Sequence, residues 1–246
     1  MNPGQPIWRE DADLVTASEA YAQRFAGPVG AHFLAVQTRA VLGLLAPWPG
    51  ATVLDVGGGH AQTALPLAAA GYQVTVAGSR PECGRRLARL MTPGSYEFRA
   101  VDLMNLPFAE RSFDLVLSLR MLTHVADLPG YVAQLCEAAD QAVLVDYPAK
   151  RSFNLVAGAL FKAKESLDDN LHTRPFKSFW DREVLDLFRA QGFGRPRLRR
   201  QHFLPMALHR GLGSGGFTKA SEGLCRALGL TALLGSPVVL CLERLP

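Results

Sequence analysis

Short apolar runs alternate with amphipathic segments between residues 51 and 146. The apolar runs have the length of buried strands, and we expect strands at 51–56, 73–77, 96–101, 113–118 and 141–146. Three segments between them repeat apolar residues every three or four positions, which predicts helices at 62–70, 81–91 and 128–139. Short apolar strands alternating with helices indicate right-handed crossovers and a parallel sheet covered on both faces.

The regions on either side of this alternation have different patterns. Residues 10–46 repeat apolar positions at helical spacing and end at Pro47 and Pro49, so we expect a helical cap there. After residue 147 we expect a long segment over 148–177 (helical at 153–164), a helix at 179–191, a helix near 219–228, and closing strands at 197–204 and 237–244. We interpret the chain as one α/β domain, residues 1–246, with lid insertions at 148–177 and 205–235.

Composition narrows the class of protein. With 48% hydrophobic and 20% charged residues, the chain is globular, and no stretch reaches the roughly 18 apolar residues that span a bilayer. The polar N-terminus does not resemble a signal peptide, so we expect a cytoplasmic protein. The four cysteines are scattered, which predicts free thiols and no metal site.

The net charge of +4 is unevenly distributed, because the basic residues concentrate after residue 147. This excess favours an anionic substrate or a membrane surface, or else reflects an arginine-rich surface. Nothing in that region combines aromatic and basic residues as a nucleic-acid module does, so we expect no nucleic-acid partner.

Residues with candidate chemistry follow the predicted strands. The first strand ends in Asp55 and runs into three glycines, which allow a ligand to approach the backbone closely. Asp102 and Leu103 follow the third strand, where a carboxylate and a backbone N–H would suit an adenine, although Asp102 would also suit a loop cap. His124 follows the fourth strand as a candidate base.

The combination of these segments is more specific than any one of them. The stretches VLDVGGGHA, VDLMNLPFAERSFDLVLSLRMLTHV and FKSFWDREVLDLFRAQGF together resemble the class I methyltransferases that use S-adenosylmethionine (SAM). The likeness is to the branch with ubiquinone and menaquinone C-methyltransferases and related small-molecule enzymes. It implies a Rossmann-like, doubly wound sheet of seven strands, mostly parallel with the last strand antiparallel.

The resemblance also implies which residues bind SAM and what the chain does. Asp55, Gly57 and Gly59 would hold the methionine part, Asp102 and Leu103 the adenine, and Ser118 and Leu119 would line the sulfonium. Tyr21 matches a tyrosine that closes over the cofactor. The implied activity is transfer of the SAM methyl group to a small-molecule acceptor.

The sequence departs from the family pattern at two positions. Ala61 stands where the first loop normally ends in a glycine, which is acceptable if its φ is negative. Gly78 stands where the family has an acidic residue for the ribose hydroxyls, so Ser79 or a lid residue would have to replace it. Two alternatives therefore stay open: an NADP-binding oxidoreductase, with Arg80 on the 2′-phosphate, and an inactive SAM-fold partner or sensor protein.

The acceptor side of the site is less defined. If the acceptor is a hydroxyl or an acidic carbon, the candidate bases are His124, His172 and Tyr147. Residues 152–164 are apolar and then basic, which is typical of a packed lid helix and also of a segment that covers a lipid-like or isoprenoid acceptor or contacts a membrane peripherally.

Overall fold

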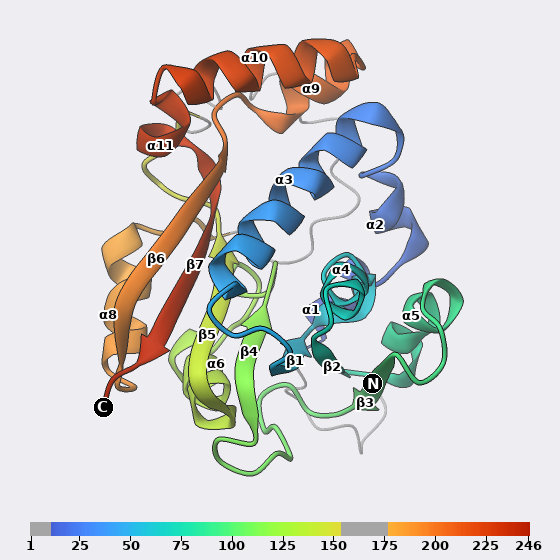
Figure 1. The fold of residues 1–246 in the computed structure, drawn as a ribbon, viewed down its shortest axis with the longest axis vertical. Helices are drawn as coiled ribbons and strands as arrows, with labels where there is room; N and C mark the ends of the chain where they lie inside the picture. The colour runs from blue at the N-terminus through green and yellow to red at the C-terminus, as the bar shows by residue number, and fades with distance from the viewer. Residues whose placement is uncertain (1–10, 154–176) are drawn as a thin grey trace, which may run out of the picture.

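The computed structural model describes residues 11–153 and 177–246, which form a seven-stranded sheet with helices on both faces (Figure 1). The spatial order of the strands is β3-β2-β1-β4-β5-β7-β6. Their bounds are β1 Thr52–Val56, β2 Gln73–Gly78, β3 Tyr96–Ala100, β4 Phe113–Ser118, β5 Ala139–Tyr147, β6 Phe193–His202 and β7 Ser236–Arg244.

The direction of the strands confirms the predicted sheet. Strands β1 to β5 pair in parallel, and β7 runs antiparallel to both β5 and β6, between which it lies. The strand order reverses between β1 and β4. In open parallel sheets, ligands bind at the carboxyl ends of the strands next to such a reversal.

The helices cover the sheet in two layers, and the strand residues alternate between them. Val53 of β1 packs with α3 (Gly27–Leu45), α4 (Ala64–Ala69) and α5 (Arg85–Leu90) in one apolar cluster. Its neighbour Leu54 packs with α6 (Leu128–Ala138) and α8 (Asp181–Arg189) on the opposite face. Both faces are therefore buried, which explains why the strands read as continuous apolar runs.

Further helices lie at the carboxyl end of the sheet. The N-terminal region forms α1 (Ala12–Thr16) and α2 (Glu19–Gln23), which together with α3 confirm the helical prediction for this region. Between β6 and β7 the chain forms α9 (Met206–Leu212), α10 (Gly215–Ala227) and α11 (Leu230–Leu234), seen at the top of Figure 1. The lid function of 205–235 stays a prediction, and most of the other lid, 154–176, lies outside the described residues.

Several boundaries differ from the prediction. The helices expected at 62–70 and 81–91 are α4, which begins only at Ala64, and α5, which begins at Arg85 after a 3₁₀ turn at Pro81–Gly84. Strand β6 begins at Phe193, four residues before the predicted start. The prediction missed these residues because the register of β6 shifts between Gly194 and Arg197, which interrupts the side-chain alternation that marks a strand. Helix α10, expected near 219–228, begins earlier, at Gly215, after a Ser214 cap whose side chain accepts the Phe217 N–H.

One helix also qualifies the expectation about membrane spans. Helix α3 is long and apolar enough to cross a bilayer by length and composition, unlike what we expected from the sequence. In the structure, 44% of its apolar window is buried, and Val41, Leu44 and Leu45 pack on the sheet. Burial of this kind is typical of the core helix of a globular domain.

Candidate functional site

The loops after the first three strands are joined by backbone hydrogen bonds at the carboxyl edge of the sheet. The Gly57 N–H donates to the Ala77 carbonyl of β2 at 2.8 Å, and the Val101 N–H donates to the Gly78 carbonyl at 2.8 Å. The predicted cofactor residues of these three loops, from Asp55 to Leu103, are thus neighbours in space. Most of them are fully buried.

Asp55 is a buried carboxyl group at the end of β1. Its side chain has no exposed surface, and neither carboxylate oxygen has a hydrogen-bond partner within the described residues. Burial raises the pKa of Asp55 to about 7, while the positive charge of Arg120 acts in the opposite direction. A buried carboxylate without partners is costly, so this one is suited to a cationic ligand group.

The glycine loop after Asp55 is closely covered. Gly57 has a φ of +80°, and a Cβ placed there would lie 2.8 Å from the Met121 side chain. The loop ends at Ala61, whose φ is +60°. The condition under which alanine would be acceptable at this position, a negative φ, is therefore not met, and this left-handed alanine costs roughly 1 kcal/mol that a glycine would avoid.

Arg120 is a site residue that the sequence reasoning missed. It follows β4 with a φ of +66°, and its backbone N–H donates to Asp146 Oδ1 at 2.5 Å. Its Nη2 donates to Gln37 Oε1 at 2.8 Å, and its Nη1 is buried with no partner in the described part of the chain. Arg120 lies within the sequence stretch that resembles the family, but the orientation of its side chain and backbone depends on contacts with α3 and β5.

The guanidinium group of Arg120 also contacts the N-terminal cap. It lies 4.5 Å from the ring centre of Phe25 and 5.6 Å from that of Tyr21, distances at which a cation is attracted to an aromatic face. Tyr21, the predicted cofactor lid, therefore lies beside the charged end of the site. Its contact with a cofactor stays a prediction.

The end of β2 is faced by two acidic residues from the N-terminal segment. The Ser79 N–H donates to Asp13 Oδ2 at 2.7 Å, and Arg80 forms an ion pair with Asp11 at 3.8 Å. The predicted cofactor residues Gly78 and Ser79 are both buried. Two carboxylates beside this loop repel a phosphate, which disfavours the NADP alternative.

The remaining predicted cofactor residues occupy the ends of β3 and β4. Asp102 is partly buried, and its Oδ1 accepts the Met104 N–H at 3.0 Å, so it caps its own loop. Leu103 and Leu119 are buried in apolar clusters, and the Ser118 hydroxyl lies 2.7 Å from that of Tyr131 on α6. Contacts of these residues with adenine or sulfonium stay predictions.

The three candidate bases have different surroundings. His124 is partly buried in the loop after β4, and its backbone N–H donates to the Met121 carbonyl at 2.9 Å. Tyr147 is buried and donates to Asp181 Oδ1 at 3.0 Å, and burial together with Asp181 raises its pKa. A tyrosine held protonated in this way is poorly suited to act as a base, and a catalytic role for Tyr147 stays a prediction. His172 lies outside the described residues.

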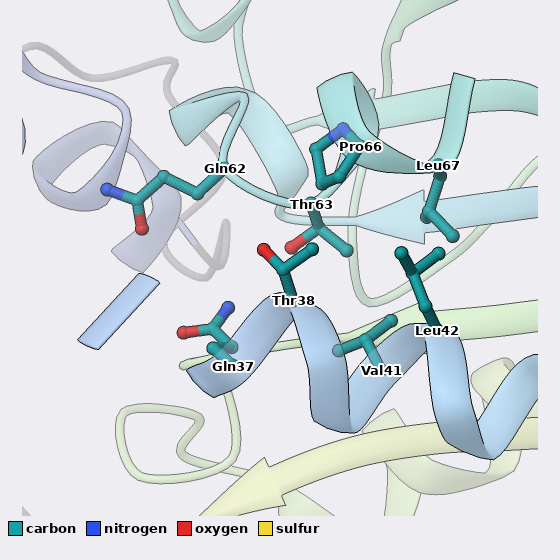
Figure 2. Close-up of a pocket in the computed structure, with 8 residues that line it drawn as sticks. All are labelled: Gln37, Thr38, Val41, Leu42, Gln62, Thr63, Pro66 and Leu67. Carbon is teal, nitrogen blue, oxygen red and sulfur yellow. The ribbon is translucent and has the colours of Figure 1, made fainter. Parts of the chain in front are cut away.

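A small pocket lies between α3 and α4, next to the glycine loop (Figure 2). In Figure 2 the hydroxyl groups of Thr38 and Thr63 lie toward one another, while the apolar side chains line the other end. Gln37, which lines this pocket, is also the partner of the Arg120 guanidinium. The pocket therefore adjoins the charged end of the site.

This strand order, with a glycine loop after β1 and an antiparallel β7, defines the class I SAM-dependent methyltransferase fold. Residues 54–140 match the family model described as "Methyltransferase domain". The chain therefore contains a stretch that matches a methyltransferase domain, and its fold is similar to that of SAM-dependent methyltransferases of known structure.

Individual relatives are similar over part of the chain or in fold. The O-methyltransferase cnsE of Penicillium expansum is 32% identical over 105 residues, which covers 41% of this chain and 38% of that protein. The chain thus matches less than half the length of this curated relative.

The solved structures share the fold at low identity. Magnesium protoporphyrin IX methyltransferase from Synechocystis PCC 6803, with bound SAH, has a TM-score of 0.61 at 15% identity, covering 99% of this chain and 90% of that one. The [4+2]-cyclase SpnF has a TM-score of 0.55 at 18% identity, covering 99% of this chain and 84% of that one. Because a cyclase shares the fold, the fold by itself does not determine the reaction.

Proposed function

We propose that this chain binds SAM and transfers its methyl group to a small-molecule acceptor. The observation that carries this proposal is the Asp55 carboxylate, which is fully buried, lacks partners in the described structure and directly precedes the glycine loop. The guanidinium group of Arg120 lies close enough to act on the pKa of Asp55, and its Nη1 has no hydrogen-bond partner within residues 11–153 and 177–246.

The opposite charges of these two groups suit the amino-acid end of SAM. The Asp55 carboxylate would accept hydrogen bonds from the ammonium group, and the free Nη1 of Arg120 would donate to the carboxylate. Both groups are costly to bury alone, so a zwitterionic ligand would compensate both at once. SAM, when bound, supplies an electrophilic methyl group, and the residues of this chain bind it, orient the acceptor and exclude water.

Calorimetric titration with SAM and with NADPH tests the class of ligand. We expect SAM to bind with a micromolar Kd and NADPH to show no binding, because Asp11 and Asp13 face the loop that a 2′-phosphate would occupy. Binding of NADPH alone would favour the oxidoreductase. Absence of SAM binding by the folded protein would favour an inactive partner or sensor protein.

An oxygen atom is the acceptor atom that the curated relative supports, since that relative is described as an O-methyltransferase. Methylation of a hydroxyl group releases its proton, so a base has to be near the acceptor. His124 remains the candidate among the described residues, at the carboxyl end of β4.

A lipid-like or isoprenoid acceptor is the finer part of the proposal. The segment 152–164 that suggested it lies largely outside the described residues, but α9 to α11 expose large apolar side chains at the same end of the sheet. These are Leu212, Phe217, Leu224, Leu228 and Leu233, all at least 42% exposed. Exposed apolar groups on helices that also carry the exposed basic residues Arg210 and Lys219 suit the surface of an anionic membrane.

Cosedimentation with vesicles that contain phosphatidylglycerol tests this surface. We expect the protein to bind them, and Leu224→Glu/Leu228→Glu to weaken binding at least about tenfold, because two apolar side chains no longer enter the interface. Leu65→Glu/Leu90→Glu is the control, since these leucines of α4 and α5 are also exposed, by 42% and 44%, but lie outside α9 to α11. A wild-type protein that does not bind the vesicles, or an equal loss of vesicle binding in both double variants, would contradict a membrane-bound acceptor.

A further inference from the structure

The end of β2 has no room for the acidic side chain that the family places there. A Cβ added to Gly78 would lie 2.8 Å from the Cys83 Cβ and 3.0 Å from the Phe98 ring. Both neighbours belong to the packed layer under this loop. An aspartate at position 78 would therefore have to displace them, and the ribose carboxylate has to come from elsewhere in the chain.

A carboxylate from α1 lies beside this position. Asp13 is completely buried, and its Oδ2 accepts the N–H of Ser79, the residue immediately after Gly78. Its Oδ1 has no hydrogen-bond partner among the residues that the structure describes. The nearby Cys83 thiol stays protonated, because burial, the charge of Asp13 and a hydrogen bond to the Asp13 carboxylate raise its pKa to about 12.

Helix α1 is held against the site at three points. Ala12 packs in the same apolar cluster as Ala77 and Leu103, which flank the ends of β2 and β3. The Ala17 Cβ lies 3.1 Å from where a Cβ on Gly59 would be, and Asp11 pairs with Arg80. Asp13 is thus fixed between the glycine loop and the loop after β2.

We propose that Asp13 binds the vicinal hydroxyl groups of the cofactor ribose, in place of the acidic residue that is missing at Gly78. This inference rests on the proposed binding of SAM. The free Oδ1 accepts a hydrogen bond from one hydroxyl, and Oδ2, which keeps the Ser79 N–H, has a second lone pair for the other. The ribose ligand of this protein therefore comes from the N-terminal cap, 65 residues before the usual position in the chain.

The test measures binding of S-adenosylhomocysteine (SAH) and of an SAH analogue without the two ribose hydroxyls, by calorimetry. We expect Asp13→Asn to weaken SAH binding about 10- to 100-fold, which corresponds to the loss of a charge-assisted hydrogen bond. The analogue should bind the wild type and Asp13→Asn equally. Glu19→Gln is the matched control, since Glu19 lies on α2 and forms ion pairs with Arg86 and with the exposed Arg89.

Each other outcome overturns this inference. Equal SAH affinity in wild type and Asp13→Asn, or an equal loss for SAH and for the analogue, would mean that Asp13 does not bind the hydroxyls. Tighter SAH binding after deletion of residues 1–17 would mean that α1 blocks the site. If Asp13→Asn does not fold, Asp13→Ser is the variant to test instead, because its hydroxyl group can still accept the Ser79 N–H. A wild-type protein that does not bind SAH would refute the proposed function itself. Equal affinities, equal losses or tighter binding after the deletion would refute only the role of Asp13.

Discussion

Asp55→Asn is expected to weaken SAM binding about 10- to 100-fold and, at the same time, to stabilise the ligand-free protein at pH 8. The first effect follows from the loss of the charge that would pair with the SAM ammonium group. The second follows because the buried carboxylate has no partner in the described structure, so a neutral side chain of the same shape is less costly there.

The sign of the pH dependence follows from the raised pKa of Asp55. The folded protein binds this proton with a pKa of about 7, whereas the unfolded chain binds it near 3.9. Between these values the folded state holds more protons, so the free energy of unfolding falls as the pH rises, by on the order of 4 kcal/mol in total. The contribution of protonated Asp55 to the free energy of unfolding is complete below about pH 4 and is lost above about pH 7.

Thermal melting of wild type and Asp55→Asn at pH 5, 6.5 and 8 measures the change in stability. Calorimetric titration with SAM measures the loss of affinity. Asp114→Asn is the control of opposite sign, because hydrogen bonds from Thr52 lower the pKa of Asp114. We expect that variant to be destabilised at pH 8. An Asp55→Asn protein that melts below the wild type at pH 8 would refute the cost of the buried carboxylate.

Asp181→Ala is expected to lower the free energy of unfolding by about 3–5 kcal/mol. The side chain of Arg200 on β6 is 2% exposed and forms an ion pair with Asp181 on α8. Arg200 also donates to the Gly235 carbonyl at 3.1 Å, just before β7. Removal of the carboxylate leaves the guanidinium charge buried without its counterion, at the junction of α8, β6 and β7.

Urea denaturation of matched variants separates the charge from the hydrogen bond. Tyr147→Phe removes only the bond from the tyrosine hydroxyl to Asp181, so it should cost about 0.5–1.5 kcal/mol and leave methyl transfer unchanged. Asp181→Ala/Arg200→Met should recover most of the lost stability, since no buried charge remains. A cost below about 1 kcal/mol for Asp181→Ala would show that solvent or another group compensates Arg200.

The sequence predicts the parts of this protein that depend on local patterns. Alternation of apolar strands and helices determines the parallel half of the sheet, and the glycines after Asp55 locate the edge where a ligand binds. The antiparallel β7 was expected from the resemblance, since its apolar run carries no information about direction. The start of β6 was missed because the shift at Gly194 interrupts the side-chain alternation.

The site residues that the sequence did not reveal are those whose partners are distant in the chain. Asp13 stands in a five-residue helix with no motif around it, and its importance depends on contact with Ser79. Arg120 belongs to a recognised segment, but its side chain is positioned by Gln37 of α3. The surroundings of Tyr147 could not be predicted, because its partner, Asp181, is contributed by α8.

The position of β7 has a consequence for the order in which the protein is made. Strand β5 pairs on one side with β4 and on the other with β7, and β6 pairs with β7. While the ribosome is still translating, β6 therefore has no strand to pair with, and β5 exposes one edge, until residues 236–244 emerge. Such edges favour pairing with other chains, so the nascent protein is expected to depend on chaperones until the last strand is inserted.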